Sequence, residues 1–117
     1  MTGRPLNDQE RSLLRHLLSV PFDGVADLRT QVDRAVTTSP PGANLDLAVP
    51  ETAPLPGGMT GAAPIIAEVT RDSGYAGELL LWLRGGLLAG VEYAWVTDEP
   101  PSALPAPGDV RVRARHD

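Results

Sequence analysis

Residues 77–96 read GELLLWLRGGLLAGVEYAWV and are the longest apolar segment with a clear structural signal in the chain. Two apolar runs flank the pair Gly85-Gly86. A two-residue hairpin loop requires positive φ angles, which glycine adopts without steric cost. The stretch therefore predicts a β-hairpin that turns at Gly85-Gly86, with Arg84 opposite Leu87.

An uninterrupted register assigns the faces of this hairpin, because successive side chains of a strand point to opposite sides. The predicted pairs are Leu83 with Leu88, Trp82 with Ala89, Leu81 with Gly90, Leu80 with Val91 and Glu78 with Tyr93. One face then holds Leu80, Trp82, Leu87, Ala89, Val91, Tyr93 and Trp95. The other face holds Leu79, Leu81, Leu83, Leu88, Gly90, Glu92, Ala94 and Val96. Neither face has a polar residue at every second position, so either the chain covers both faces or another molecule covers one.

Length and composition restrict the class of protein. A chain of 117 residues predicts a single domain, 1–117. The absence of cysteine excludes disulfides, thiolate metal sites and a cysteine nucleophile. All ten basic side chains are arginine, which excludes lysine chemistry such as Schiff bases and a phosphate-loop lysine. No apolar run reaches the roughly 20 residues of a membrane span, and the first residues lack the apolar core of a signal peptide, so we expect a cytoplasmic protein without membrane contact.

The net charge of -5 is unevenly distributed. Residues 40–109 carry nine acids against two arginines, whereas residues 110–117 carry three arginines against one acid. Nucleic-acid binding depends largely on neutralising phosphates. The acidic middle of the chain therefore argues against a nucleic-acid partner.

Two helices are expected before the sheet. Asn7 and Glu10 form an N-x-x-E capping pattern ahead of an apolar stripe at helical spacing, which is Leu13, Leu14, Leu17 and Leu18. Asp23 is the predicted N-cap of a second helix that runs through about Val36. Its apolar positions are Val25, Leu28, Val32, Ala35 and Val36, and its positions left largely for solvent are Asp27, Arg29, Gln31, Asp33 and Arg34.

The remaining strands are expected at 44–49, 64–71 and 110–115. The last is either a short edge strand protected by its arginines or a frayed end. Irregular segments rich in proline and glycine are predicted at 37–43, 50–63 and 98–109. The predicted fold class is therefore α+β, with two N-terminal helices packed on one face of an antiparallel sheet of four to five strands that runs as a meander. Which face the helices cover stays open.

The order of these features resembles a family of short uncharacterised actinobacterial proteins. The resemblance covers most of the chain and rests on the leucine-rich first helix and on three segments: FDGVADLRTQ at 22–31, GGLLAGVEYAWVTDEPP at 85–101 and LPAPGDV at 104–110. Members often carry cysteines in the segment equivalent to 37–44, where this chain has none. The resemblance implies no established activity, and no site residue carries over from it.

Residues with catalytic potential are scarce. His16 has no second ligand at helical spacing and His116 lies next to the last residue, so both are expected at the solvated surface rather than in a metal site. No serine lies in a nucleophile motif such as G-x-S-x-G. The sequence predicts neither a metal site nor a cofactor.

Glu92 is the candidate functional carboxylate. The uninterrupted register places it opposite Leu79 on a leucine-lined face, where an unpaired carboxylate would have a raised pKa and could act as a general base or a ligand anchor. The alternative is a structural role near a sheet edge, paired with an arginine such as Arg29 or open to water. Both interpretations remain, and the second is favoured.

Three aromatic side chains share one predicted face, namely Trp82, Tyr93 and Trp95. They form either a binding surface, in which rigid aromatic rings are common, or the core against the helices. The leading functional prediction is a non-enzymatic protein-interaction module, either a homodimer or a small adaptor-like or immunity-like protein. The alternative is a small ligand-binding protein or enzyme with a pocket between sheet and helices, walled by Glu92, Tyr93 and Trp82, in which Arg29 clamps an anion.

Overall fold

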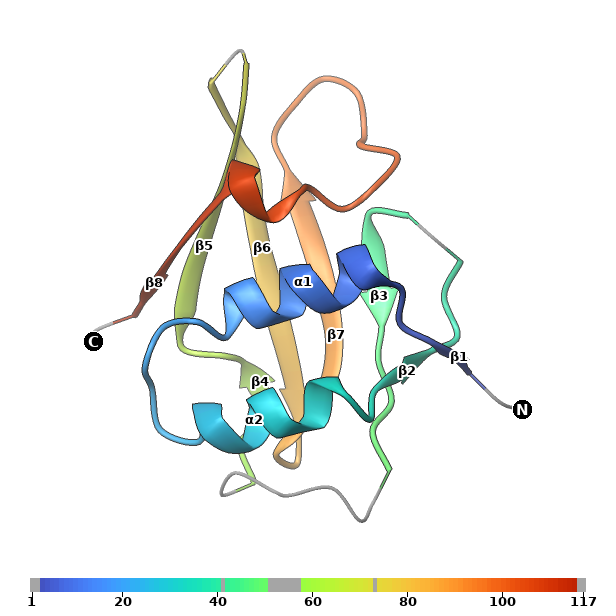
Figure 1. Ribbon diagram of the computed structural model, residues 1–117. Helices are drawn as coiled ribbons and strands as arrows, with labels where there is room; N and C mark the ends of the chain where they lie inside the picture. Colours follow the sequence, from blue (N-terminus) through green and yellow to red (C-terminus); the bar gives the residue numbers. More distant parts are fainter. Residues whose placement is uncertain (1–2, 41, 51–57, 73, 116–117) are drawn as a thin grey trace.

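The computed structural model describes residues 3–40, 42–50, 58–72 and 74–115. The fold is α+β with antiparallel strands, as predicted, and in Figure 1 both helices lie in front of the sheet. The helices are α1 (Asp8–Leu17) and α2 (Val25–Val32), and a 3-10 turn, η1, spans Pro107–Asp109. The strands are β1 (Arg4–Pro5), β2 (Val36–Thr37), β3 (Asn44–Asp46), β4 (Gly61–Ala62), β5 (Ile65–Arg71), β6 (Gly74–Arg84), β7 (Leu87–Trp95) and β8 (Val110–Ala114).

Within the described residues the main sheet has six strands, so the predicted number of four to five is wrong. The strands run in the order β3-β7-β6-β5-β8, and β4 pairs with β6 beside the end of β5. The consecutive strands β5, β6 and β7 form the predicted meander. β1 and β2 form a separate two-stranded sheet. The two-residue strands β1, β2 and β4 were not predicted because they are too short to show an alternating pattern.

The start of α1 follows the sequence signal. Asn7 is the N-cap, its side chain accepts from the Glu10 backbone N–H at 2.8 Å, and the Glu10 carboxylate accepts from the Asn7 N–H at 2.8 Å. This reciprocal capping box satisfies two backbone donors that no helix turn can reach. Arg4 adds a bidentate contact to the same carboxylate, at 2.9 and 2.8 Å. The N-terminal strand β1 is thereby tied to the first turn of the helix.

Glu10 gives the fold a predictable pH dependence. The hydrogen bonds from Arg4 above all, and then from the Asn7 backbone, hold the pKa of Glu10 below its ordinary value of about 4.3, although burial acts in the opposite direction. A carboxylate with a lowered pKa stabilises the folded state above the ordinary value, and this contribution is lost as the pH falls through the folded pKa. We expect Glu10→Gln to lower the free energy of unfolding by about 1 kcal/mol at pH 7 and by much less at pH 3.

Urea unfolding at the two pH values measures this difference. Gln9→Ala, at the exposed neighbouring position, is the control and should show the same small effect at both pH values. An effect of Glu10→Gln that is equal at pH 7 and pH 3 would contradict the assignment.

The second helix is shorter than predicted at both ends. Gly24, rather than Asp23, is the N-cap, and the helix ends at Val32 rather than near Val36. Val36 instead exchanges two backbone hydrogen bonds of 2.9 Å with Ala48 and belongs to β2. These tertiary partners override a helical apolar pattern that continues to Val36. The expected strand at 44–49 ends early as well, since regular pairing of β3 stops at Asp46.

The hairpin turns at Gly85 and Gly86, whose φ angles are +57° and +83°, as the sequence predicts. The predicted register holds only from Arg84 and Leu87 to the next pair, Leu83 with Leu88. It then shifts by one residue, so that Trp82 lies opposite Gly90 and Leu80 opposite Glu92. The shift is a β-bulge in β7 at Ala89, which has no partner in the register.

The bulge exchanges the two sides of β7, so the predicted faces beyond Ala89 are wrong. Val91 and Tyr93 turn to the side of Leu81, where each is 2% exposed, and Glu92 turns to the side of Trp82. A shift of one residue has this effect because side chains alternate with a period of two. The sequence does not reveal it, since both runs are apolar on both sides.

The core lies between the helices and the sheet side that carries Leu79, Leu81 and Leu88. Its fully buried side chains also include the predicted stripe of α1 and the apolar face of α2, namely Leu14, Leu17, Leu18, Leu28 and Val32. The segment after β7 returns over this side, where Leu104 packs against the core and η1 contacts α1. β8 is the predicted edge strand with outward arginines. Among the described residues, no helix is long and apolar enough to cross a membrane.

Candidate functional site

The side of the sheet opposite the core is called the open face below. Its members alternate along each strand with the buried residues. They are Asn44 and Asp46 on β3; Ile66, Glu68 and Thr70 on β5; Glu78, Leu80, Trp82 and Arg84 on β6; Glu92 and Ala94 on β7; Arg111 and Arg113 on β8. The face is mixed rather than apolar, because the bulge moves Val91 and Tyr93 into the core and brings Glu92 out.

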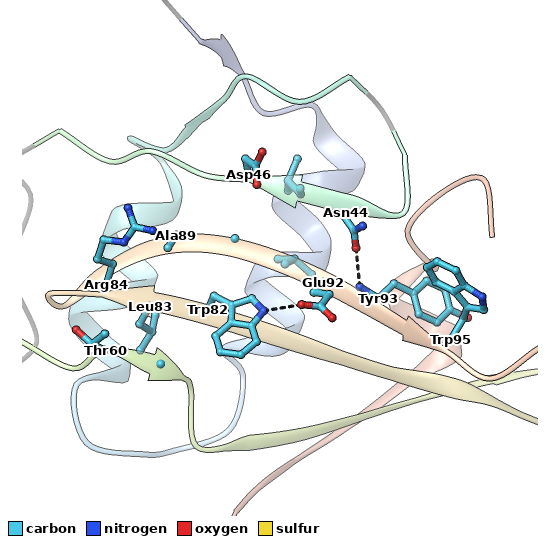
Figure 2. Close-up of a pocket in the computed structure, with 14 residues that line it drawn as sticks. Asn44, Asp46, Thr60, Trp82, Leu83, Arg84, Ala89, Glu92, Tyr93 and Trp95 are labelled. Carbon is cyan, nitrogen blue, oxygen red and sulfur yellow. Dashed lines mark hydrogen bonds between the residues drawn. The ribbon is translucent and has the colours of Figure 1, made fainter. Parts of the chain in front are cut away.

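Trp82 and Glu92 meet at the centre of the open face. The Trp82 indole Nε1–H donates to Glu92 Oε1 at 3.2 Å, as drawn in front of β6 and β7 in Figure 2. Trp82 is 37% exposed and Glu92 is exposed. The hydrogen bond fixes the orientation of a large ring that would otherwise rotate, and it satisfies the polar atom of that ring. Glu92 therefore lies in the open rather than on the leucine-lined side predicted for it.

A broad hollow of about 770 Å³ surrounds this pair. It extends over β3, β7, β6 and β4, and its polar side chains are Asn44, Asp46, Thr60, Trp82, Arg84 and Glu92. A hydrogen bond to β7 holds the Asn44 side chain in place, because its Oδ1 accepts from the Tyr93 backbone N–H at 3.1 Å. The exposed side chains Asp46, Arg84 and Glu92 leave the hollow with both signs of charge.

The structure separates the three aromatic residues that were predicted to share a face. Tyr93 is a buried core residue, Trp82 belongs to the open face, and Trp95 lies near the end of β7 with 41% exposure. All three still border the hollow. Tyr93 is therefore part of the core, whereas the two tryptophans remain accessible at the surface.

Arg29 does not join the other predicted residues. It lies on α2, on the helix side of the sheet, where its Nε–H donates to the Leu18 backbone oxygen at 2.7 Å. A pocket between sheet and helices would need space that Leu28 and Leu81 fill in the core. A second hollow, of about 590 Å³, lies elsewhere, between the first turns of α1 and residues 103–107.

His16 is the histidine within the described residues, and it has a structural contact. His16 is half-buried, with Nε2 at 2.6 Å from the Val110 backbone oxygen, so it links α1 to β8 rather than lying free in solvent. His116 lies outside the described residues. No group of three or more potential metal ligands occurs in the part of the chain that the structure describes.

Sequence reasoning missed two contributors to the hollow and one buried polar residue. Asn44 and Asp46 could have been found from the alternation at 44–49, which places them on one side of β3. Gln31, assigned to the solvent-facing side of the second helix, is fully buried against the hairpin turn. No local signal distinguishes it from its exposed neighbours.

Comparison with known proteins adds no relative: no protein-family model, curated protein or solved structure matches this chain.

Proposed function

We propose that this protein is a non-enzymatic interaction module that binds a protein partner through its open face. The observation that supports this most is the exposed Trp82 ring, fixed by Glu92 beside Leu80 and Ile66 in the middle of a helix-free sheet face. Large rigid aromatic rings at the centre of a patch carry much of the binding energy in protein interfaces. Charged side chains surround this centre, as in the polar rim of an interface.

A small-ligand protein is the second candidate, favoured by the polar atoms of Asn44, Trp82 and Glu92 that border the hollow. Its volume lies within the range of small-molecule sites, about 300–1,000 Å³. The hollow, however, is a broad depression across four strands rather than a cleft. Such a surface suits an extended partner better than a molecule that must be enclosed on most sides.

Site-specific photo-crosslinking tests the proposal. A benzophenone side chain replaces Trp82 in one variant and Thr30, exposed on the helix side, in a matched control. In the cells that produce the protein, irradiation should give a discrete crosslinked species from position 82 and none from position 30. The same product from both positions, or none from either, would contradict an interaction module that uses this face. A product with a second copy and a product with another protein both support it.

A further inference from the structure

The β3-β7 side of the open face is acidic, whereas the β5-β8 side carries two arginines on β8 and one acid, Glu68, on β5. In the strand order β3-β7-β6-β5-β8, β6 is central and two strands lie on each side of it. Asp46 and Glu92 lie on the β3-β7 side, and Arg111 and Arg113 lie on β8. Among the described residues the only ion pair of these four is an exposed contact of 3.8 Å between Arg113 and Glu68.

We propose that the partner of the open face is a second copy of this chain, related by a two-fold axis that runs along β6 in the interface. This inference rests on the proposed function and names its partner. Rotation about such an axis places the β3 side of one copy over the β8 side of the other. Glu92 of each copy then lies at the level of Arg113 of its partner, and Asp46 lies over the same arginine-bearing edge two residues further along the strand. The contact occurs twice because a two-fold interface is self-complementary.

The register supports the alignment along the strands. Glu92 pairs with Leu80, and Arg113 pairs with Ile66. Ile66 also lies level with Leu80, because the next pair along these strands is Ala67 with Leu79. Rotation about an axis along β6 preserves this level. Glu92 of one copy and Arg113 of the other are then offset sideways by about one strand spacing, ~4.8 Å, between sheets that pack about 10 Å apart, within reach of their long side chains.

The centre and the area of the face also fit a second copy. Trp82 and Leu80 lie on the axis strand, so each packs against the centre of the other copy, while the charged residues form the rim. Sheets that pack face to face keep their strands within about 30° of each other, which this axis satisfies. The molecule measures 43 × 37 × 21 Å, and a patch of about 800 Å² per copy, the size of a standard interface, fits on its broad side.

Glu78 provides an internal check, because it opposes the association. It lies on β6 opposite Glu68, so the same axis brings these carboxylates close to those of the second copy. Like charges at an interface weaken it. Glu78→Gln should therefore tighten self-association, whereas a partner with a basic surface would bind this variant less well.

Charge-reversal variants test the geometry. The acid-reversed variant carries Asp46→Lys and Glu92→Lys, and the base-reversed variant carries Arg111→Glu and Arg113→Glu; all four positions are exposed. In sedimentation velocity at about 100 μM, the unchanged chain should be dimeric, and each variant alone should associate at least about a hundredfold more weakly. An equimolar mixture should form a heterodimer, because one of its two symmetry-related contacts keeps the native charges and the other regains opposite charges with both signs exchanged.

The control variant, Asp23→Lys with Asp33→Lys, changes the net charge as much as the acid-reversed variant does, at two other exposed positions of the α2 region, and should remain a homodimer. Circular dichroism and unfolding midpoints verify that all variants fold. A chain that stays monomeric at 100 μM overturns the second copy as partner, while a crosslink from position 82 to another protein would still support the interaction module. A dimer that survives both reversals, or a mixture that forms no heterodimer, overturns the two-fold arrangement.

Discussion

Gln31→Leu is expected to lower the free energy of unfolding by about 2–6 kcal/mol. Gln31 Nε2 donates to the Gly86 oxygen and Gln31 Oε1 accepts from the Leu88 N–H, both at 2.9 Å, and the residue is fully buried. Leucine has a similar volume but leaves one buried acceptor and one buried donor without these partners. Each such group costs about 1–3 kcal/mol.

The position of Gln31 explains the size of this effect. Leu47 N–H donates to Ala89 O at 2.9 Å, and the next backbone groups toward the turn, at Leu88 and Gly86, pair with the Gln31 amide instead. The side chain thus replaces the peptide group of a strand and holds α2 against the hairpin. Without the Gln31 amide, the end of the hairpin loses two hydrogen bonds and α2 loses its attachment to the hairpin.

Chemical denaturation of Gln31→Leu, with Thr30→Ala at the exposed neighbouring position as control, measures the cost. Gln31→Glu refines the test, because a carboxylate at this site would face the Gly86 oxygen at neutral pH, whereas the protonated acid can donate to it. Burial and this contact raise the folded pKa of the new acid, so the variant should regain stability as the pH falls. A loss below about 1 kcal/mol for Gln31→Leu would contradict the assigned role.

Gly77→Ala should be the most destabilising glycine substitution in the sheet. Gly77 has φ +141°, and a Cβ at this position would lie 2.3 Å from the Ala94 oxygen and 2.9 Å from the Trp95 Cα. Both neighbours are backbone atoms, so β6 and β7 must move apart to admit a methyl group. Strain at such a φ costs about 1–3 kcal/mol, and overpacking adds about 1–3 kcal/mol.

Gly74→Ala is the matched control for this substitution. Gly74 has φ +112°, but a Cβ there meets no atom within 4 Å, so the variant reports backbone strain alone. The difference between the two unfolding free energies then measures the steric contact with β7. Equal losses in the two variants would show that β7 yields without cost, contrary to the prediction.

The sequence predicted the parts of the fold that depend on local chemistry. The Gly85-Gly86 turn, the Asn7 cap and the buried stripe of α1 follow from positive φ, a side-chain hydrogen bond and helical periodicity. The edge strand at 110–114 follows from alternation of apolar residues with arginines. Each of these signals acts within a few residues, so a single sequence contains it in full.

The candidate site could be predicted only in part. Trp82 and Glu92 were singled out, but on opposite sides of the hairpin, because nothing in the run LLAGVEYAW marks the bulge at Ala89. Arg29 was assigned to the same pocket, although it lies on the helix side of the sheet. Which residues share a face depends on the register of two strands, and that register depends on how well each alternative buries its side chains against the helices.

The α+β class, the hairpin and its turn can be predicted from the sequence, because glycine geometry and apolar periodicity are local properties of the chain. Three features arise only when the chain folds: Tyr93 becomes a core residue, Gln31 completes the hairpin edge, and Trp82 meets Glu92 on the open face. The physical reason is that the bulge shifts one strand by a single residue, and both strand faces are apolar enough for either register. Packing against the helices selects the register, and the information for this packing is spread over several segments of the chain.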